Sequence, residues 1–215
     1  MDPLGALIDP LGTLIDWIAV YGIVGLVAIG VAERFVPVLP SYGVLVAIGI
    51  AAADGSWSVT SAVIGTVAGS LAGCLLLYGL AIALSERRTH RLLAGVGRLA
   101  GMSPKRVDSA VSSFRAYQRA LAFGTQLVPT VRLVSPVIAG LFRADARAFA
   151  IASLAGITVW NALFISVGHL AAAIAPTTSA STLALQVLIL LIVAEVLLAL
   201  GWRWLRRPAS DGMAR

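Results

Sequence analysis

Two apolar segments near the beginning of the chain are each too short to cross a membrane. Residues 17–32 and 41–53 carry no charge, but a transmembrane helix needs roughly 20 consecutive apolar residues. The segments are separated by an acid and two prolines: Glu33, Pro37 and Pro40. Proline breaks a helix and frees backbone carbonyl groups, which a membrane interior tolerates only where protein or water covers them. The pattern therefore predicts a re-entrant hairpin over residues 17–54.

A second broken segment lies further along the chain. Residues 120–142 are apolar but are interrupted by Pro129, Arg132 and Pro136. By the same argument, we predict a second re-entrant hairpin here.

Three other segments are long enough to span a bilayer. Residues 58–84 contain no charge over 27 positions, which predicts a full and tilted span. Residues 148–172 and 183–202 also read as spans. The first of these segments carries three glycines at a spacing of four: Gly65, Gly69 and Gly73. They lie on one helical face, so we expect them to form a ridge for close helix packing.

The remaining segments are polar or basic. Residues 1–16 repeat the pattern "DPLGALI" as "DPLGTLI", which is consistent with an amphipathic segment at the interface or with a frayed tail. Residues 85–119 hold eight Lys or Arg, and we expect a helical, surface-lying loop. Residues 203–215 form a basic tail.

The basic residues also predict an orientation. Arg34 is the only basic residue among the first 84, whereas residues 85–119 and the tail are rich in arginine. Because cytoplasmic loops carry the excess of Lys and Arg, these basic segments are expected inside, with Asp54 and Thr177 outside. The first hairpin would then open outward and the second inward, which is the pattern of an inverted-repeat transporter.

Composition supports a membrane class. The chain is 59% hydrophobic and only 12% charged, with a mean hydropathy of +0.94, whereas soluble domains are about a quarter charged. We therefore predict one all-α polytopic membrane domain over residues 1–215, with two inverted re-entrant helical hairpins plus transmembrane helices. The net charge of +6 then indicates a cytoplasmic face near anionic lipid and not a nucleic-acid partner.

Enzyme and cofactor signatures are missing from the sequence. The single cysteine, Cys74, excludes an internal disulfide, and the two histidines, His90 and His169, are too far apart for a histidine-rich metal site. No HExxH, GxSxG, Walker or dinucleotide-binding motif occurs. We expect neither an enzyme nor a cofactor.

Four ionisable residues lie at membrane depth: Glu33, Arg34, Arg132 and Glu195. Each costs ~2.5–3.5 kcal/mol at the bilayer centre if charged, so such residues usually mark a transport pathway. If the two breaks meet, Glu33 faces Arg132, which could hold a phosphate bidentately while Glu33 exchanges a proton. The alternative is a structural ion pair. We expect Arg34 to snorkel toward water and Glu195 to be structural.

Two polar residues of the 148–172 segment have simpler explanations. We expect His169 to make an interhelical hydrogen bond, although it could also relay protons, and Asn161 to make an interhelical polar contact.

At these residues the sequence resembles the DedA family, also called SNARE-associated or VTT-domain membrane proteins. The similar stretches are "ERFVPVLPS", "GSLAGCLLLYG", "QLVPTVRLVSPVIAG" and "VWNALFISVGHLAA". They occur in the family's order between residues 15 and about 173.

The resemblance implies a lipid flippase or scramblase of the bacterial inner membrane, while the cytoplasmic position of the C-terminus is expected from the basic tail. Its substrate would be undecaprenyl phosphate or a phospholipid, moved with proton coupling. The residues that it implies for the lipid site are Glu33, Pro37, Pro40, Tyr42, Gln126, Pro129 and Arg132. Tyr42 stands where the family usually has a second acid, and Gln126 where it usually has an arginine. Passive scrambling or a divergent substrate therefore stays open.

Two other functions fit the same residues. An ion/proton antiporter would use the Glu33–Arg132 pair for coupling, and a non-transporting assembly factor would use the hairpins for packing only. A homo-oligomer is compatible with each of them.

Overall fold

The computed structural model describes the central part of the chain. The described residues are 10–36, 41–84, 89, 91, 109, 112–114, 116–174, 182, 186, 189, 190 and 193. Within these ranges the chain is helical, without a strand. The expected segments 1–9, most of 85–119, most of 183–202 and the tail 203–215 lie outside them.

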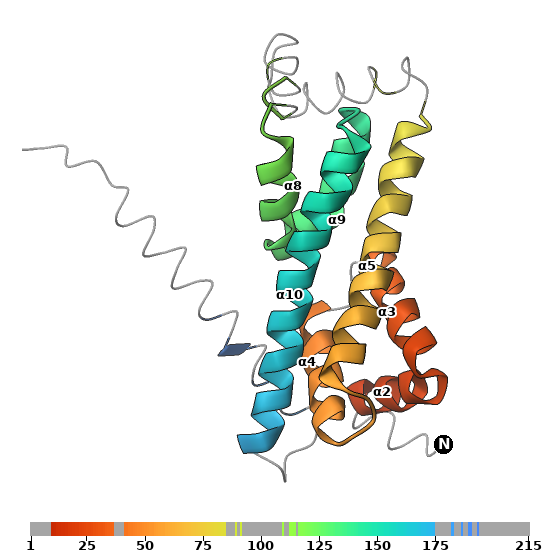
Figure 1. Cartoon of the computed structure of the whole chain (residues 1–215), viewed down its shortest axis with the longest axis vertical. Helices are drawn as coiled ribbons and strands as arrows, with labels where there is room; N and C mark the ends of the chain where they lie inside the picture. The colour runs from red at the N-terminus through yellow and green to blue at the C-terminus, as the bar shows by residue number, and fades with distance from the viewer. Residues whose placement is uncertain are drawn as a thin grey trace, which may run out of the picture.

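Two long helices form the frame of the molecule (Figure 1). Helix α5 runs over Val59–Ile82 and helix α10 over Ala146–Ile174, and they pack against each other. Both are long and apolar enough to cross a membrane. Their starts are fixed by local capping: the Ser58 hydroxyl accepts a hydrogen bond from the Ser61 amide at 3.0 Å, and the Asp145 carboxylate accepts one from the Ala148 amide at 2.7 Å.

Two pairs of shorter helices fill the space beside this frame. The first broken pair consists of α3 (Ile23–Phe35) and α4 (Ser41–Ala53). The second broken pair consists of α8 (Gln118–Gln126) and α9 (Pro129–Leu141). They occupy opposite ends of the long helices, so that their breaks face each other near mid-height (Figure 1). The re-entry of each pair into a membrane stays a prediction.

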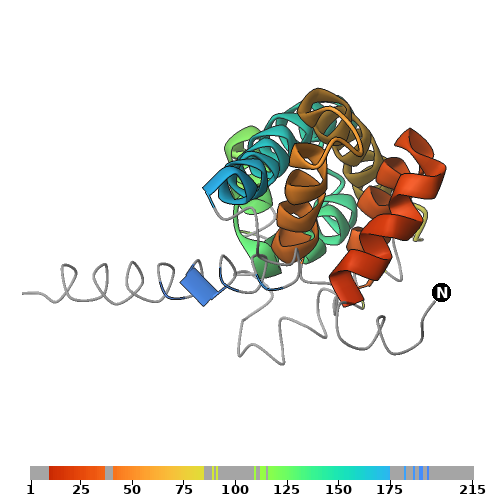
Figure 2. The same cartoon turned by 90° about the horizontal axis from the view of Figure 1, so that it is seen from below.

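In each broken pair, one helix packs on α5 and the other packs on α10. Helices α3 and α9 pack on α5, whereas α4 and α8 pack on α10. Helix α2 (Pro10–Tyr21) lies at one edge of the bundle, α10 at the other, and α4 between them (Figure 2). The chain turns between α2 and α3 at Gly22, whose φ of 55° suits glycine.

Glycines allow the helices to approach closely at all four of these contacts. A Cβ atom at Gly69 of α5 would collide with the backbone of Val27 on α3, and one at Gly168 of α10 would collide with Val46 on α4. Gly140 of α9 and Gly156 of α10 meet backbone atoms of α5 and α8 in the same way. The predicted packing ridge on α5 is thereby confirmed, and it holds α3 against the frame.

Candidate functional site

Glu33 lies in the last turn of α3 and joins three helices. Its side chain is only 4% exposed. One carboxylate oxygen, Oε1, accepts a hydrogen bond from the Ser70 hydroxyl of α5 at 2.5 Å. The same oxygen accepts one from Arg132 Nη2 of α9 at 2.8 Å. The acid of the first break is therefore paired with the base of the second, as the sequence predicted.

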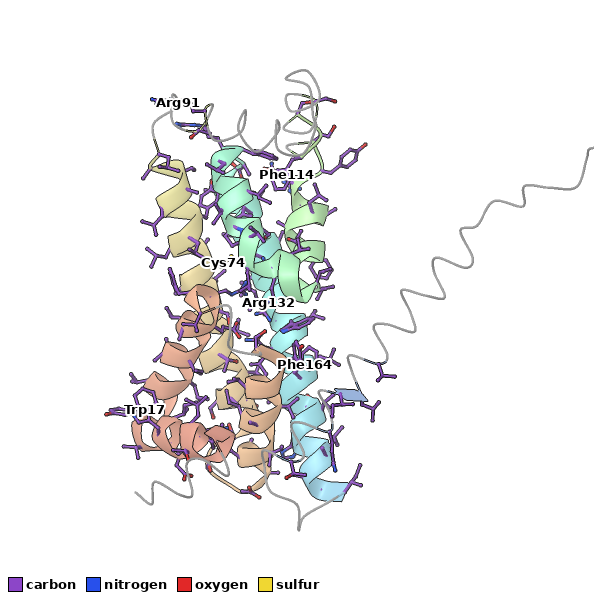
Figure 3. All side chains as sticks on the ribbon, turned by 180° about the vertical axis from the view of Figure 1, so that it is seen from behind. Trp17, Cys74, Arg91, Phe114, Arg132 and Phe164 are labelled. Atoms are coloured by element: carbon purple, nitrogen blue, oxygen red, sulfur yellow. The ribbon has the colours of Figure 1, made fainter. Side chains whose placement is uncertain are left out.

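Arg132 is held at mid-height of the bundle (Figure 3). Arg132 is only 1% exposed, and it is the largest of the fully buried side chains that the structure describes. Besides Glu33, its guanidinium donates from Nη1 to the Ser41 hydroxyl of α4 at 3.3 Å. Its Cζ lies 5.1 Å from the ring centroid of Trp160 on α10, within the range of a cation–π interaction. Helices α3, α4 and α10 thus all contact this one cation.

Arg34 does not snorkel, so the expectation for this residue was wrong. It is 3% exposed and extends into the opposite break, where Nη1 donates to Gln126 Oε1 at 3.0 Å and to the Arg132 carbonyl at 3.2 Å. Gly73 of α5 makes room for its stem, because a Cβ there would lie 3.0 Å from Arg34 Cγ. Depth in the sequence does not reveal side-chain direction, and here a polar partner lies across the break.

Positive charge exceeds negative charge at this site. Among the described residues, Glu33 supplies one carboxylate against the guanidinium groups of Arg34 and Arg132. Three nitrogens of these two arginines have no hydrogen-bond partner within the described structure: Arg34 Nε, Arg34 Nη2 and Arg132 Nε. Buried donors of a charged group are expensive to leave unpaired. The arrangement is therefore suited to an additional anion.

The other predicted site residues differ in how they are placed. Gln126 is fully buried and holds Arg34, while its amide nitrogen lies 3.5 Å from the Ser135 hydroxyl. Tyr42 is partly buried, with its ring centroid 6.1 Å from that of Phe164. Pro129 begins α9, but its side chain lies outside the described part of the structure, as do Pro37 and Pro40 entirely.

Helix α10 contributes buried polar groups whose hydrogen bonding differs from what the sequence suggested. In the part of the chain that the structure describes, the Asn161 amide and Trp160 Nε1 make no hydrogen bond. Asn161 is fully buried without a hydrogen bond from its amide, and His169 Nδ1 is likewise without a partner there. Ser70 and Ser41, which bind Glu33 and Arg132, were missed because a neutral hydroxyl gives no charge signal.

The described residues contain no group of three or more His, Cys, Asp or Glu side chains that could hold a metal ion. Cys74 is buried and free. His90 and Glu195 lie outside the description.

The fold and the site together define a helical membrane protein with a buried ionic site between two facing helix breaks. The chain belongs to the VTT-domain family, also known as the DedA family, because residues 36–170 match the family model described as "VTT domain". The resemblance seen in the sequence is thereby confirmed.

Three curated proteins are similar to most of the chain. Undecaprenyl phosphate transporter A of Staphylococcus aureus is 27% identical over 155 residues, which are 72% of this chain and 76% of that protein. Two proteins named alkaline phosphatase-like, from Lactococcus lactis subspecies cremoris and lactis, are 26% and 24% identical. Each of these alignments covers 69% of this chain and 70% of the relative. No solved structure gives a significant match.

Proposed function

We propose that this protein is a transporter that moves a phosphate-bearing lipid across the bacterial inner membrane, and that it is not an enzyme. The observation that carries the proposal is the buried contact between Glu33 and Arg132, which come from opposite breaks and are 99 residues apart in the chain. Ionisable groups buried in a membrane usually mark a transport pathway. The similar transporter of Staphylococcus aureus, whose name gives undecaprenyl phosphate as its substrate, supports a lipid of this kind.

The donors of the site can bind either of two acceptors, the Glu33 carboxylate or a phosphate group. In the structure, Glu33 Oε1 accepts from Arg132 Nη2 and from the Ser70 hydroxyl. A phosphate oxygen is an acceptor of the same kind, and guanidinium binds phosphate bidentately. The carboxylate of Glu33 thus holds the place that the lipid headgroup takes during transport, and the two compete for one set of donors.

A proton on Glu33 would decide this competition. Its charged neighbours are Arg34 on its own helix and Arg132 on α9, and Ser70 faces it from α5. A neutral carboxyl group attracts a guanidinium less than a carboxylate does. Protonation of Glu33 therefore releases Arg132 to the phosphate, and reionisation expels the lipid. Undecaprenyl phosphate and phospholipids both offer the required headgroup.

The outer surface supports a lipid environment for the long helices. Large apolar side chains project outward from α10 along its length, including Ile151, Val159, Leu163 and Leu170. Such a broad apolar face is unusual on a soluble monomer. A lipid tail could remain in the bilayer while its headgroup reaches the buried site.

The test is transport of a fluorescent phosphate-bearing lipid by the purified protein in liposomes. Arg132→Ala should reduce translocation by at least about a hundredfold, because it removes a buried charge-assisted donor pair. Arg132→Lys should recover only part of the rate, since lysine keeps the charge but loses the bidentate fork. Arg147→Ala, at an exposed arginine in the first turn of α10, is the control and should transport normally. Wild-type rates in a folded Arg132→Ala protein would refute the proposal.

A further inference from the structure

Arg34 has no task in the transport cycle proposed above. That cycle uses Glu33, Arg132 and Ser70, yet a second arginine is buried beside them. Its guanidinium is one charge more than the described site needs for balance. Keeping a guanidinium in a buried setting with unpaired donors is costly unless something binds it.

The unpaired side of Arg34 faces the same oxygen that Arg132 holds. Arg34 Nε lies 3.7 Å from Glu33 Oε1, which is too long for a hydrogen bond but within ion-pair distance. Arg132 Nη2 lies 2.8 Å from that oxygen. The two guanidinium groups therefore converge on one acceptor position, with Ser70 as a third donor.

The opposite side of Arg34 is fully engaged. Nη1 donates both to Gln126 Oε1 at 3.0 Å and to the Arg132 carbonyl at 3.2 Å. These two contacts are enough to fix the guanidinium plane, and they leave Nε and Nη2 without a hydrogen-bond partner in the described structure. A purely structural brace would not need to leave the converging donors open.

We propose that Arg34 is a second phosphate-binding residue of this site and that Gln126 positions it without contacting the ligand. The inference rests on the proposed function, because it assigns the same phosphate headgroup to both arginines. A phosphate oxygen at the position of Glu33 Oε1 would receive hydrogen bonds from Arg132 Nη2 and the Ser70 hydroxyl, and it would lie within ion-pair distance of Arg34 Nε. Because the Arg34 guanidinium ends at the Gln126 side chain, its charge could equally be supplied from position 126.

The first experiment measures binding to the purified full chain in detergent. The probes are farnesyl phosphate, farnesol and inorganic phosphate, and calorimetry measures the affinity for each. Arg34→Gln should weaken farnesyl phosphate binding by about tenfold to a hundredfold, the usual loss for a charged hydrogen-bond donor. Farnesol binding should not change. If inorganic phosphate competes, free phosphate shares the site; if it does not, the site requires the lipid tail.

The second experiment moves the charge to the other break. In the double variant Arg34→Gln with Gln126→Arg, a guanidinium from α8 takes the place of the one from α3. Binding should return to within about threefold of the wild type, which corresponds to less than 1 kcal/mol. The control is Arg119→Gln, which removes an exposed arginine from α8 and should bind normally.

The outcomes separate this inference from the proposed function. If Arg132→Gln and Arg34→Gln both bind farnesyl phosphate like the wild type, the phosphate site itself is refuted. If only Arg34→Gln is unaffected, or if the relocated charge fails to restore binding in a folded protein, Arg34 is a structural brace. Should Arg34→Gln not fold, the relocated variant and Arg34→Lys decide the matter, since both keep a cation in the site.

Discussion

Glu33 concentrates its contacts on one oxygen atom. Oε1 receives Arg132 from α9 and Ser70 from α5, and it faces Arg34 on its own helix. A change of charge on this residue therefore acts on three helices at once.

The residue-scale prediction concerns the pH dependence of transport. Glu33→Gln resembles the protonated acid permanently, because the amide keeps the shape but cannot ionise. Lipid binding should be kept or strengthened, and the dependence of translocation on pH should disappear. The measurement is transport by the wild type and the variant in liposomes across a pH series.

Asp54→Asn serves as the matched control for that series, since it neutralises an exposed acid in the turn after α4. Its pH profile should follow the wild type. Identical profiles for the wild type and Glu33→Gln would make Glu33 a structural acid.

The sequence located part of the site but not its full composition. Glu33 and Arg132 could be paired because each is charged, lies at membrane depth and is close to a proline. Arg34 has the same depth, but its direction depends on Gln126, a partner 92 residues away. Ser70 carries no charge signal, although its position between Gly69 and Gly73 on the packing ridge would have placed it near α3.

At the scale of elements, glycines decide how closely the helices approach. Gly30 of α3 and Gly69 of α5 meet across one contact, and Gly49 of α4 meets α10 in the same manner. These close approaches bring Ser70 near enough to reach Glu33. The packing of the frame and the geometry of the site are therefore coupled.

Gly69→Ala should destabilise the protein, because the added methyl group would meet the backbone of Val27. Overpacking of this kind costs about 1–3 kcal/mol. Gly79→Ala is the matched control: it lies on the same helix with open space around it, and alanine should stabilise it by about 0.5–1 kcal/mol. Thermal unfolding in detergent measures both. A melting temperature for Gly69→Ala at or above that of Gly79→Ala would contradict the close approach.

The element boundaries were more predictable than the packing. Helix α3 ends at Phe35, shortly before the first proline pair, and α9 begins at Pro129, where proline is favoured. Pro136, which was expected to interrupt the second segment, lies inside α9. The partner of each short helix was not predictable, because α4 is apolar on every side and its sequence marks no preferred face.

At the scale of the whole molecule, two broken pairs face each other within a frame of two long helices (Figure 1). The residues of the site therefore come from helix pairs at opposite ends of the bundle. Its orientation in a bilayer follows from the distribution of basic residues, which stays a prediction.

The orientation can be tested by labelling with an impermeant thiol reagent. In a Cys74→Ser background, a cysteine introduced at Thr177 should react with reagent added outside intact cells. A cysteine at Arg91 should react only after the membrane is opened, because the basic segment is expected inside. Labelling of Arg91→Cys in intact cells would contradict the predicted topology. The Cys74→Ser protein without an introduced cysteine is the blank for labelling. Because the native Cys74 is buried, its replacement should change the background labelling little.

The separation of the site between two breaks has a consequence for how the protein is made. A ribosome adds roughly 5–20 residues per second, so the 99 residues from Glu33 to Arg132 take on the order of 5–20 s to synthesise. During that interval Glu33 has only the first of its two ion-pair partners, the neighbouring Arg34, and the two together carry no net charge. The first half of the site is therefore synthesised as a neutral pair of adjacent residues, and its surplus positive charge arrives only with Arg132 of α9.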